Sequence, residues 1–158
     1  LFKRLSAGEK YTVMKLQDIK NMKDFIQQLA DEDCHLYMWV TSNFLQDGLD
    51  TMKHWGFRYI TNVVWNKTTG CGMGQYFRTQ HEICLFGTKG KTQLNKKQYV
   101  GSVISAPRRE HSRKPEQMYD LIEKRSPGPY IELFARNTRE GWDSWGNEVG
   151  KFDKGETE

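Results

Sequence analysis

The hydrophobic pattern constrains the fold of this chain most strongly, because short apolar runs alternate with segments of helical periodicity. From Leu16 to Ala30 apolar residues recur every three or four positions, which is the spacing of an amphipathic helix in one or two pieces. Short runs rich in aromatic and β-branched residues predict strands. These runs cover residues 34–40, 57–66, 83–87, 99–105 and 130–135. Strands that alternate with helices indicate an α/β domain with a mainly parallel sheet and crossover helices.

Residues typical of caps and turns place further boundaries. Asn43 can cap a helix that Gly56 ends. Pro115 is expected as the first residue of another helix, which the proline- and glycine-rich segment 126–129 stops. The glycine-rich segment 68–80 is longer than an ordinary connection, so it predicts a functional loop.

Composition bounds the class of protein. The length of 158 residues predicts one domain, over residues 1–150, followed by a polar tail over residues 151–158. The net charge of +4 permits a polyanionic partner without requiring one. Three cysteines in none of the spacings that bind zinc indicate reduced thiols rather than disulfides or a metal site. Without an apolar run near ~18 residues or a signal peptide, we expect no membrane contact and a soluble intracellular protein, in the cytoplasm or nucleoid.

Basic residues gather directly before the helix predicted at Pro115. They are Arg108, Arg109, His111, Arg113 and Lys114. Exposed backbone N–H groups at a helix N-terminus attract anions, and arginine and lysine add charge-assisted bonds to phosphate or carboxylate. The segment therefore predicts an anion-binding site, with a solvated basic loop as the alternative.

Polar residues also follow the strand predicted over residues 130–135. Ligands of open α/β sheets lie outside the carboxyl ends of strands, which is where Arg136 and Asn137 stand. Glu132 lies inside this strand, where a carboxylate costs several kcal/mol unless it is paired or bound to a ligand. Glu132 is thus either a ligand-binding residue or one partner of a salt bridge with a neighbouring helix.

Two tryptophans, Trp142 and Trp145, stand among polar residues in the segment 141–148. Aromatic faces beside amide and carboxylate groups suit a nucleoside, because the rings stack and the polar groups bond the ribose. The alternative is a pair of tryptophans that closes the edge of the core.

These three segments together resemble the signature sequences of the MT-A70 family of adenine-N6 methyltransferases. The resembling sequences are His111-Ser112-Arg113-Lys114-Pro115, Glu132-Leu133-Phe134-Ala135-Arg136 and Gly141-Trp142-Asp143-Ser144-Trp145-Gly146-Asn147-Glu148. Upstream, the segments 36–41, 55–57, 64–68 and 81–87 are similar to the same family in order and spacing. The resemblance covers about residues 11–149.

The resemblance implies a permuted Rossmann-like methyltransferase fold, with a mainly parallel sheet and helices on both faces. It implies S-adenosylmethionine as the cofactor and methyl transfer to the N6 amine of adenine in nucleic acid, with DNA favoured over RNA. It also allows a homodimer or a heterodimer. The cofactor-binding positions that it implies are Lys114, Glu132, Arg136, Asn137, Asn147 and Glu148. The implied substrate-binding positions are Tyr11, Glu82, Arg108, Arg109, His111, Ser112 and Arg113, of which Tyr11 and Glu82 are expected near the target adenosine.

The family's catalytic Asp-Pro-Pro-Trp motif does not occur in this sequence, whose four prolines are never adjacent. In the family this motif precedes the position of Tyr11, so we expect it before Leu1, together with an N-terminal strand and the catalytic loop. Without this motif, residues 1–158 alone are expected to bind the cofactor weakly or not at all and to be inactive. Two other functions stay open: a catalytically silent subunit that binds nucleic acid for a partner, and an α/β domain that binds another nucleotide.

Overall fold

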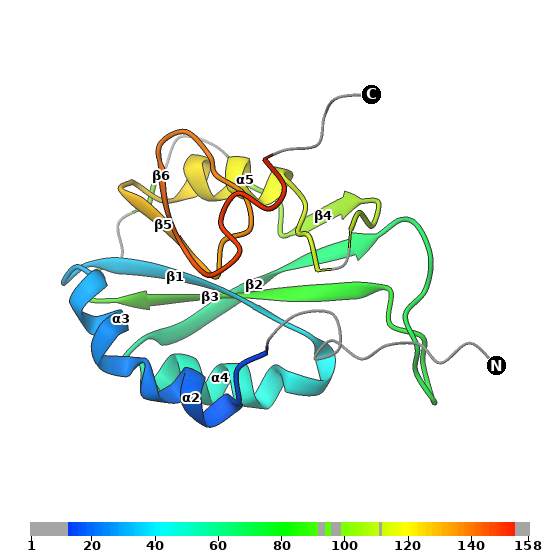
Figure 1. Ribbon diagram of the computed structural model, residues 1–158, viewed down its shortest axis with the longest axis horizontal. Helices are drawn as coiled ribbons and strands as arrows, with labels where there is room; N and C mark the ends of the chain where they lie inside the picture. The colour runs from blue at the N-terminus through cyan, green and yellow to red at the C-terminus, as the bar shows by residue number, and fades with distance from the viewer. Residues whose placement is uncertain (1–12, 92–93, 96–98, 111, 154–158) are drawn as a thin grey trace. The chain divides into compact units, whose positions relative to one another are not determined.

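The computed structural model describes residues 13–91, 94–95, 99–110 and 112–153 (Figure 1). The described residues form two compact units. The first unit contains residues 13–91 and 102–105, and the second contains residues 94–95, 99–101, 106–110 and 112–153. The chain combines helices with strands, which confirms the α/β class. The expected domain boundary after residue 150 stays a prediction.

Helices of the first unit follow the predicted periodicity. They are α2 (Leu16–Asn21), α3 (Lys23–Leu29), the short 3-10 helix η1 (Ser42–Phe44) and α4 (Leu45–His54). Asn43 lies inside η1, and the residue that caps α4 is Phe44 instead. Gly56 follows α4 with a φ of +89°, a left-handed conformation that favours glycine, and it ends this helix as predicted.

Four strands form one sheet, and all their residues except Ala106 belong to the first unit. They are β1 (Cys34–Val40), β2 (Arg58–Lys67), β3 (His81–Lys89) and β4 (Val103–Ala106), in the order β1-β3-β2-β4. Because β3 runs antiparallel to both β1 and β2, the expectation of a mainly parallel sheet is wrong for these strands. The crossover through α4 does leave β1 and β2 running in the same direction, but β3 lies between them. β3 is antiparallel because residues 68–80 contain no helix, and parallel neighbours need a crossover that is usually helical.

Helices α2, α3 and α4 lie on one side of this sheet (Figure 1). Met52 on α4 and Cys84 and Leu85 on β3 are completely buried, with 0% exposure. α4 approaches the sheet closely because Gly48 has no side chain: a Cβ at this position would lie 2.4 Å from Cγ1 of Val40. Helices on the opposite face of the sheet stay a prediction.

The second unit contains α5 (Gln117–Arg125) and a parallel pair of strands, β5 (Tyr130–Leu133) and β6 (Trp142–Trp145). The helix and the strand that the sequence predicts here both exist, but with different bounds: Pro115 precedes α5 by two residues instead of opening it, and β5 ends at Leu133 instead of residue 135. β6 was not expected. Phe134 and Gly141 have left-handed φ values of +59° and +80° at the two ends of the connection between these strands. These turns reverse the chain twice within a short connection, so that β5 and β6 run in the same direction.

Candidate functional site

The carboxyl ends of β5 and β6 bring two polar segments together. Leu133 and Trp145 are the last paired residues of the two strands. Arg136 follows β5 and Glu148 follows β6, and Arg136 Nε lies 2.9 Å from Glu148 Oε2. A hydrogen bond from Lys151 and the charge of Arg136 keep the pKa of Glu148 below its ordinary value. Two of the predicted cofactor-binding residues are therefore in contact at the edge where α/β sheets bind ligands.

Close backbone packing holds these two strand ends together. The Ala135 N–H donates to the carbonyl oxygen of Trp145, with 3.0 Å between nitrogen and oxygen. A Cβ at Gly146 would lie 3.0 Å from both Ala135 N and Phe134 Cα, so a side chain there would displace backbone. The left-handed φ of Phe134 costs about 1–3 kcal/mol, and strain of this size is typical of functional sites.

Tyr119 joins two further predicted cofactor residues. Its hydroxyl donates to Glu132 Oε2 at 2.7 Å, and Asn137 Nδ2 donates to the same hydroxyl oxygen at 3.3 Å. Tyr119 lies in the first turn of α5, so these contacts tie the start of α5 to the carboxyl end of β5. The sequence argument did not select Tyr119. The signal that could have found it is its position three residues before the buried Ile122, on the inner face of the helix.

Burial shifts the pKa values of this cluster. Burial raises the pKa of the Glu132 carboxyl, and the hydrogen bond from Tyr119 lowers it in part. Burial also raises the pKa of the Tyr119 hydroxyl, and the neighbouring Glu132 carboxylate raises it further. Tyr119 is therefore a protonated donor at neutral pH. The helix partner expected for Glu132 exists, but it is a phenol rather than a cation.

Trp142 packs against other side chains of the second unit. Its ring stacks on Tyr130 with ring centroids 4.8 Å apart. Its indole N–H donates to Glu123 Oε1 at 2.8 Å, and Arg139 Nε lies 2.8 Å from the same oxygen. These donors, Arg139 first, hold the pKa of Glu123 below its ordinary value. Trp142 thus closes the edge of the core, whereas Trp145 is 41% exposed.

Lys114 and Asn147, the other predicted cofactor residues, belong to the same unit. Lys114 is partly buried, and its backbone carbonyl accepts a hydrogen bond from Arg109 Nη2 at 3.0 Å. Asn147 is exposed and directly precedes Glu148, beyond the carboxyl end of β6. The approach of Lys114 and Asn147 to one shared cleft stays a prediction.

Carboxylates accompany the basic segment before α5. Arg109 Nη2 lies 2.8 Å from Glu116 Oε1. Arg113 lies 3.1 Å from Glu110 and 3.6 Å from Glu116, and its side chain is only 19% exposed. Arg108 is exposed. The Arg113 guanidinium is therefore mostly buried and already paired with carboxylates, whereas Arg108 lies at the surface.

Among the remaining predicted substrate-binding residues, Glu82 has the most defined surroundings. Glu82 Oε1 lies 2.6 Å from Lys67 Nζ, and the two side chains are only 13% and 7% exposed. Lys67 Nζ also lies 5.0 Å from the ring centroid of Trp65. This largely buried ion pair lies at the start of β3.

The other predicted substrate-binding residues are Ser112, Tyr11 and His111. Ser112 is exposed and has a left-handed φ of +64°. Tyr11 and His111 lie outside the described residues.

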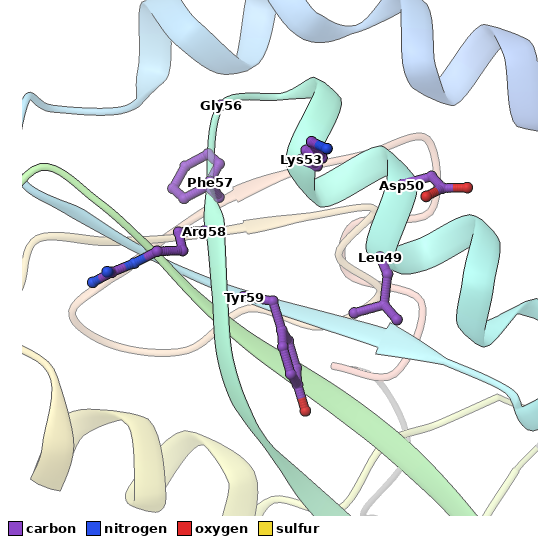
Figure 2. A pocket seen from close by; sticks show the side chains of 7 residues that line it. All are labelled: Leu49, Asp50, Lys53, Gly56, Phe57, Arg58 and Tyr59. Carbon is purple, nitrogen blue, oxygen red and sulfur yellow. The ribbon is translucent and has the colours of Figure 1, made fainter.

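An open hollow of about 550 Å³ lies in the first unit, between the end of α4 and the start of β2 (Figure 2). Its lining contains none of the predicted site residues and consists of Leu49, Asp50, Lys53, Gly56, Phe57, Arg58 and Tyr59. Within the described ranges, no three His, Cys, Asp or Glu side chains gather as a metal site would need. No helix in the same ranges is both long and apolar enough to cross a bilayer.

Several known methyltransferases are similar to this chain. The type II methyltransferase M.MunI of a Mycoplasma species is 35% identical over 147 residues, which are 91% of this chain and 62% of the relative. The human N(6)-adenosine-methyltransferase catalytic subunit METTL3 is 33% identical over 132 residues, 77% of this chain and 23% of the relative. The N(6)-adenosine-methyltransferase MT-A70-like protein of Arabidopsis thaliana is 34% identical over 125 residues, 72% of this chain and 18% of the relative.

The chain thus spans less than two thirds of the length of these curated relatives. The family model described as MT-A70 matches residues 1–148, a range that reaches from the first unit through β5 and β6. The motifs singled out in the sequence all lie within this range. The chain belongs to the MT-A70 family.

Proposed function

We propose that the protein binds S-adenosylmethionine and transfers its methyl group to the N6 amine of adenine in nucleic acid. The observation that carries the proposal is the convergence of polar groups at the carboxyl ends of β5 and β6. Arg136 and Glu148 contact each other there, and Tyr119 holds Glu132 and Asn137 at the same edge. The family match and the names of METTL3 and the Arabidopsis relative, which specify N(6)-adenosine, support adenine N6 as the site of transfer.

The donors and acceptors at this edge fit the cofactor. S-adenosylmethionine carries a carboxylate, an ammonium group and ribose hydroxyls, and when bound it supplies an electrophilic methyl group. We assign Lys114 and Arg136 to the carboxylate and the ribose, because both are cationic donors. We assign Asn137, Asn147 and Glu148 to the ribose and the adenine ring. The existing Arg136–Glu148 contact orients both side chains in advance, which reduces the entropic cost of binding.

The target adenine is assigned to the surroundings of Glu82. Glu82 forms a largely buried ion pair with Lys67, and its carboxylate oxygens can accept a hydrogen bond from an exocyclic amine. A base that reaches a buried carboxylate must leave its stack, as bases do in methyltransferases. We favour DNA over RNA, because the type II methyltransferase matches 91% of the chain and the N(6)-adenosine-methyltransferases, whose names specify a ribonucleoside, match less.

Methylation of defined substrates tests this function. The protein as its gene encodes it, with any residues that precede Leu1, is incubated with S-adenosylmethionine and adenine-containing DNA or RNA oligonucleotides. Digestion to nucleosides and mass spectrometry should then detect N6-methylated adenine, more of it from DNA. Methyl transfer to another base would contradict the proposal. Binding of nucleic acid without any binding of S-adenosylmethionine by calorimetry would favour the silent subunit instead.

The cofactor assignment has its own test. Lys114→Ala should weaken binding of S-adenosylmethionine by about 1.5–3 kcal/mol, the range for a hydrogen bond to a charged group. Lys124→Ala is a matched control, because Lys124 is an exposed lysine near the far end of α5. Equal dissociation constants for the two variants would remove Lys114 from the site.

Contacts with phosphates are proposed for Arg108, Arg109 and Arg113. Affinity for DNA should then fall steeply with salt, because binding releases counterions. The Arg108→Ala substitution should flatten the slope of log affinity against log salt by about one. Arg113→Ala should change the slope less, because Glu110 and Glu116 already balance the Arg113 charge. Fluorescence anisotropy over a salt series measures both slopes, and an affinity independent of salt would contradict these contacts.

We also propose that the chain pairs with a second copy or with another chain. The support is the loop over residues 68–80, where Tyr76 is 92% exposed and Phe77 is 89% exposed. Adjacent exposed aromatic side chains are typical of interaction surfaces. Sedimentation of the protein and of a variant with serine at both positions checks this, and identical monomeric behaviour of the two, with and without candidate partner chains, would contradict it.

A further inference from the structure

The segment Gly150–Asp153, which we call the strap, folds back onto the turn that carries Arg136. The Phe152 N–H donates to the backbone carbonyl oxygen of Arg136, with 3.0 Å between the two atoms. Asp153 accepts two hydrogen bonds from Thr138, at 2.8 Å from the backbone N–H and 2.8 Å from the hydroxyl. These contacts tie residues 152 and 153, which belong to the predicted polar tail, to the turn after β5.

The aromatic ring of Phe152 brings together two arginines that are far apart in sequence. The guanidinium carbon of Arg136 lies 4.4 Å from the ring centroid, and that of Arg113 lies 4.9 Å from it. Both arginine side chains are mostly buried, with 18% and 19% exposure. A ring at these distances attracts a guanidinium through its negative face, and the attraction grows when water is excluded.

Phe152 therefore completes the surroundings of the Arg136 side chain. Glu148 forms an ion pair with the guanidinium, with 2.9 Å between Glu148 Oε2 and Arg136 Nε. The Phe152 ring supplies a second contact, and the strap backbone holds the Arg136 carbonyl. Without the ring, the guanidinium keeps its charge partner but loses the surface against which it packs, so more of its rotamers become available.

We propose that Phe152 is a positioning residue for the cofactor site, and that the strap holds Arg136 in the orientation that receives S-adenosylmethionine. This proposal rests on the proposed function. It also extends the site past the family match, because the strap lies beyond residues 1–148. Phe152 acts through Arg136, and the same ring connects the cofactor site to Arg113 in the basic segment.

Two substitutions at this position separate the aromatic face from apolar bulk. Phe152→Leu keeps a bulky apolar side chain and removes the ring, whereas Phe152→Trp keeps an aromatic face that binds cations at least as well. Phe44→Leu is the matched control, because Phe44 is a 61% exposed phenylalanine of the first unit. Urea unfolding of all three variants shows whether each remains folded.

The first measurement is the dissociation constant of S-adenosylmethionine by calorimetry. Phe152→Leu should raise it by about 3- to 10-fold, the range expected from one lost cation–π contact. Phe152→Trp and Phe44→Leu should leave it within about twofold of the unmodified protein, since a cation–π contact is retained in one and unaffected in the other. The second measurement is the NMR shift of the Arg136 side-chain N–H, which the ring current of Phe152 displaces and which Phe152→Leu should return toward its ordinary value.

The outcomes are distinguishable. If the unmodified protein does not bind S-adenosylmethionine, the proposed function fails and this proposal fails with it. If the cofactor binds and Phe152→Leu moves the Arg136 resonance without changing the dissociation constant, Phe152 packs on Arg136 but does not position it, and this proposal alone is overturned. An Arg136 resonance that Phe152→Leu leaves unmoved would also overturn it.

Discussion

Replacing Tyr119 by phenylalanine should destabilise the protein, and by more at neutral pH than at acid pH. The Tyr119 hydroxyl donates to Glu132 at 2.7 Å and accepts from Asn137 at 3.3 Å. At neutral pH the acceptor is a partly buried carboxylate, and a hydrogen bond to a charged group contributes about 1.5–3 kcal/mol. At a pH below the ordinary pKa of Glu132 the carboxyl is protonated, and the same contact is a neutral bond of about 0.5–1.5 kcal/mol.

The sign of the pH dependence follows from the pKa of Glu132. Burial raises this pKa above its ordinary value of 4.5, and the bond from Tyr119 opposes the rise. A carboxyl with a raised pKa contributes stability that is fully present below the unfolded pKa and is lost as the pH rises through the folded pKa. Tyr119→Phe raises the folded pKa further. The difference in unfolding free energy between the unmodified protein and Tyr119→Phe should therefore grow as the pH rises from about 4 toward 7.

Tyr130→Phe provides the matched control. Tyr130 also lies in the second unit, and its hydroxyl donates to the neutral carbonyl oxygen of Ser126 at 2.8 Å. Its loss should cost about 0.5–1.5 kcal/mol at both pH values. Urea unfolding followed by circular dichroism at pH 4 and pH 7 measures all three proteins. Equal losses for Tyr119→Phe and Tyr130→Phe at both pH values would refute the assigned charge on Glu132.

Three further predictions concern stability and reactivity. Lys67→Met should cost about 3–5 kcal/mol in urea unfolding, because it removes one partner of a largely buried ion pair, and adding Glu82→Leu should restore part of the loss. Gly146→Ala should destabilise by about 1–3 kcal/mol through backbone overlap, whereas Gly101→Ala, with open space around the added Cβ, should be neutral or stabilising in the same assay. Among the cysteines the exposed Cys71 should react first with a thiol reagent, and equal rates for all three would contradict the burial pattern.

Local patterns predicted the positions of most helices and strands. The amphipathic segment 16–30 forms α2 and α3, and the aromatic run over 34–40 is β1. Strand direction was not predictable in the same way, because it depends on which strands become neighbours. β3 lies between β1 and β2, and the residues of β3 contain no pattern that predicts this position in the sheet. The missing helix in residues 68–80 was the available signal for an antiparallel pair.

The candidate site was predictable where it depends on strand ends, and unpredictable where it depends on contacts across the fold. Arg136 and Asn137 could be assigned to a ligand edge because they follow a strand. The role of Tyr119 depends on the start of α5 lying beside the end of β5. The hydrophobic periodicity of the sequence does not predict this contact between the two elements. The contact of Phe152 with Arg136 forms because the chain returns to the turn after β5 once β6 has ended. No sequence pattern relates these two residues, so the contact could not be predicted.

The turn after β5 shows how one residue converts a strand end into a site. The sequence predicts an extended strand through Ala135, but β5 ends at Leu133 and Phe134 adopts a left-handed φ. Glycine would adopt this conformation without strain. The Phe134 ring lies edge-on to Trp145, with ring centroids 5.5 Å apart, and the next residue is tied to Trp145 by the hydrogen bond from the Ala135 N–H. An extended chain would have carried Arg136 onward by about 3.3 Å per residue. With the left-handed turn at Phe134, Arg136 instead contacts Glu148, so the contact on which the proposed site depends follows directly after this turn.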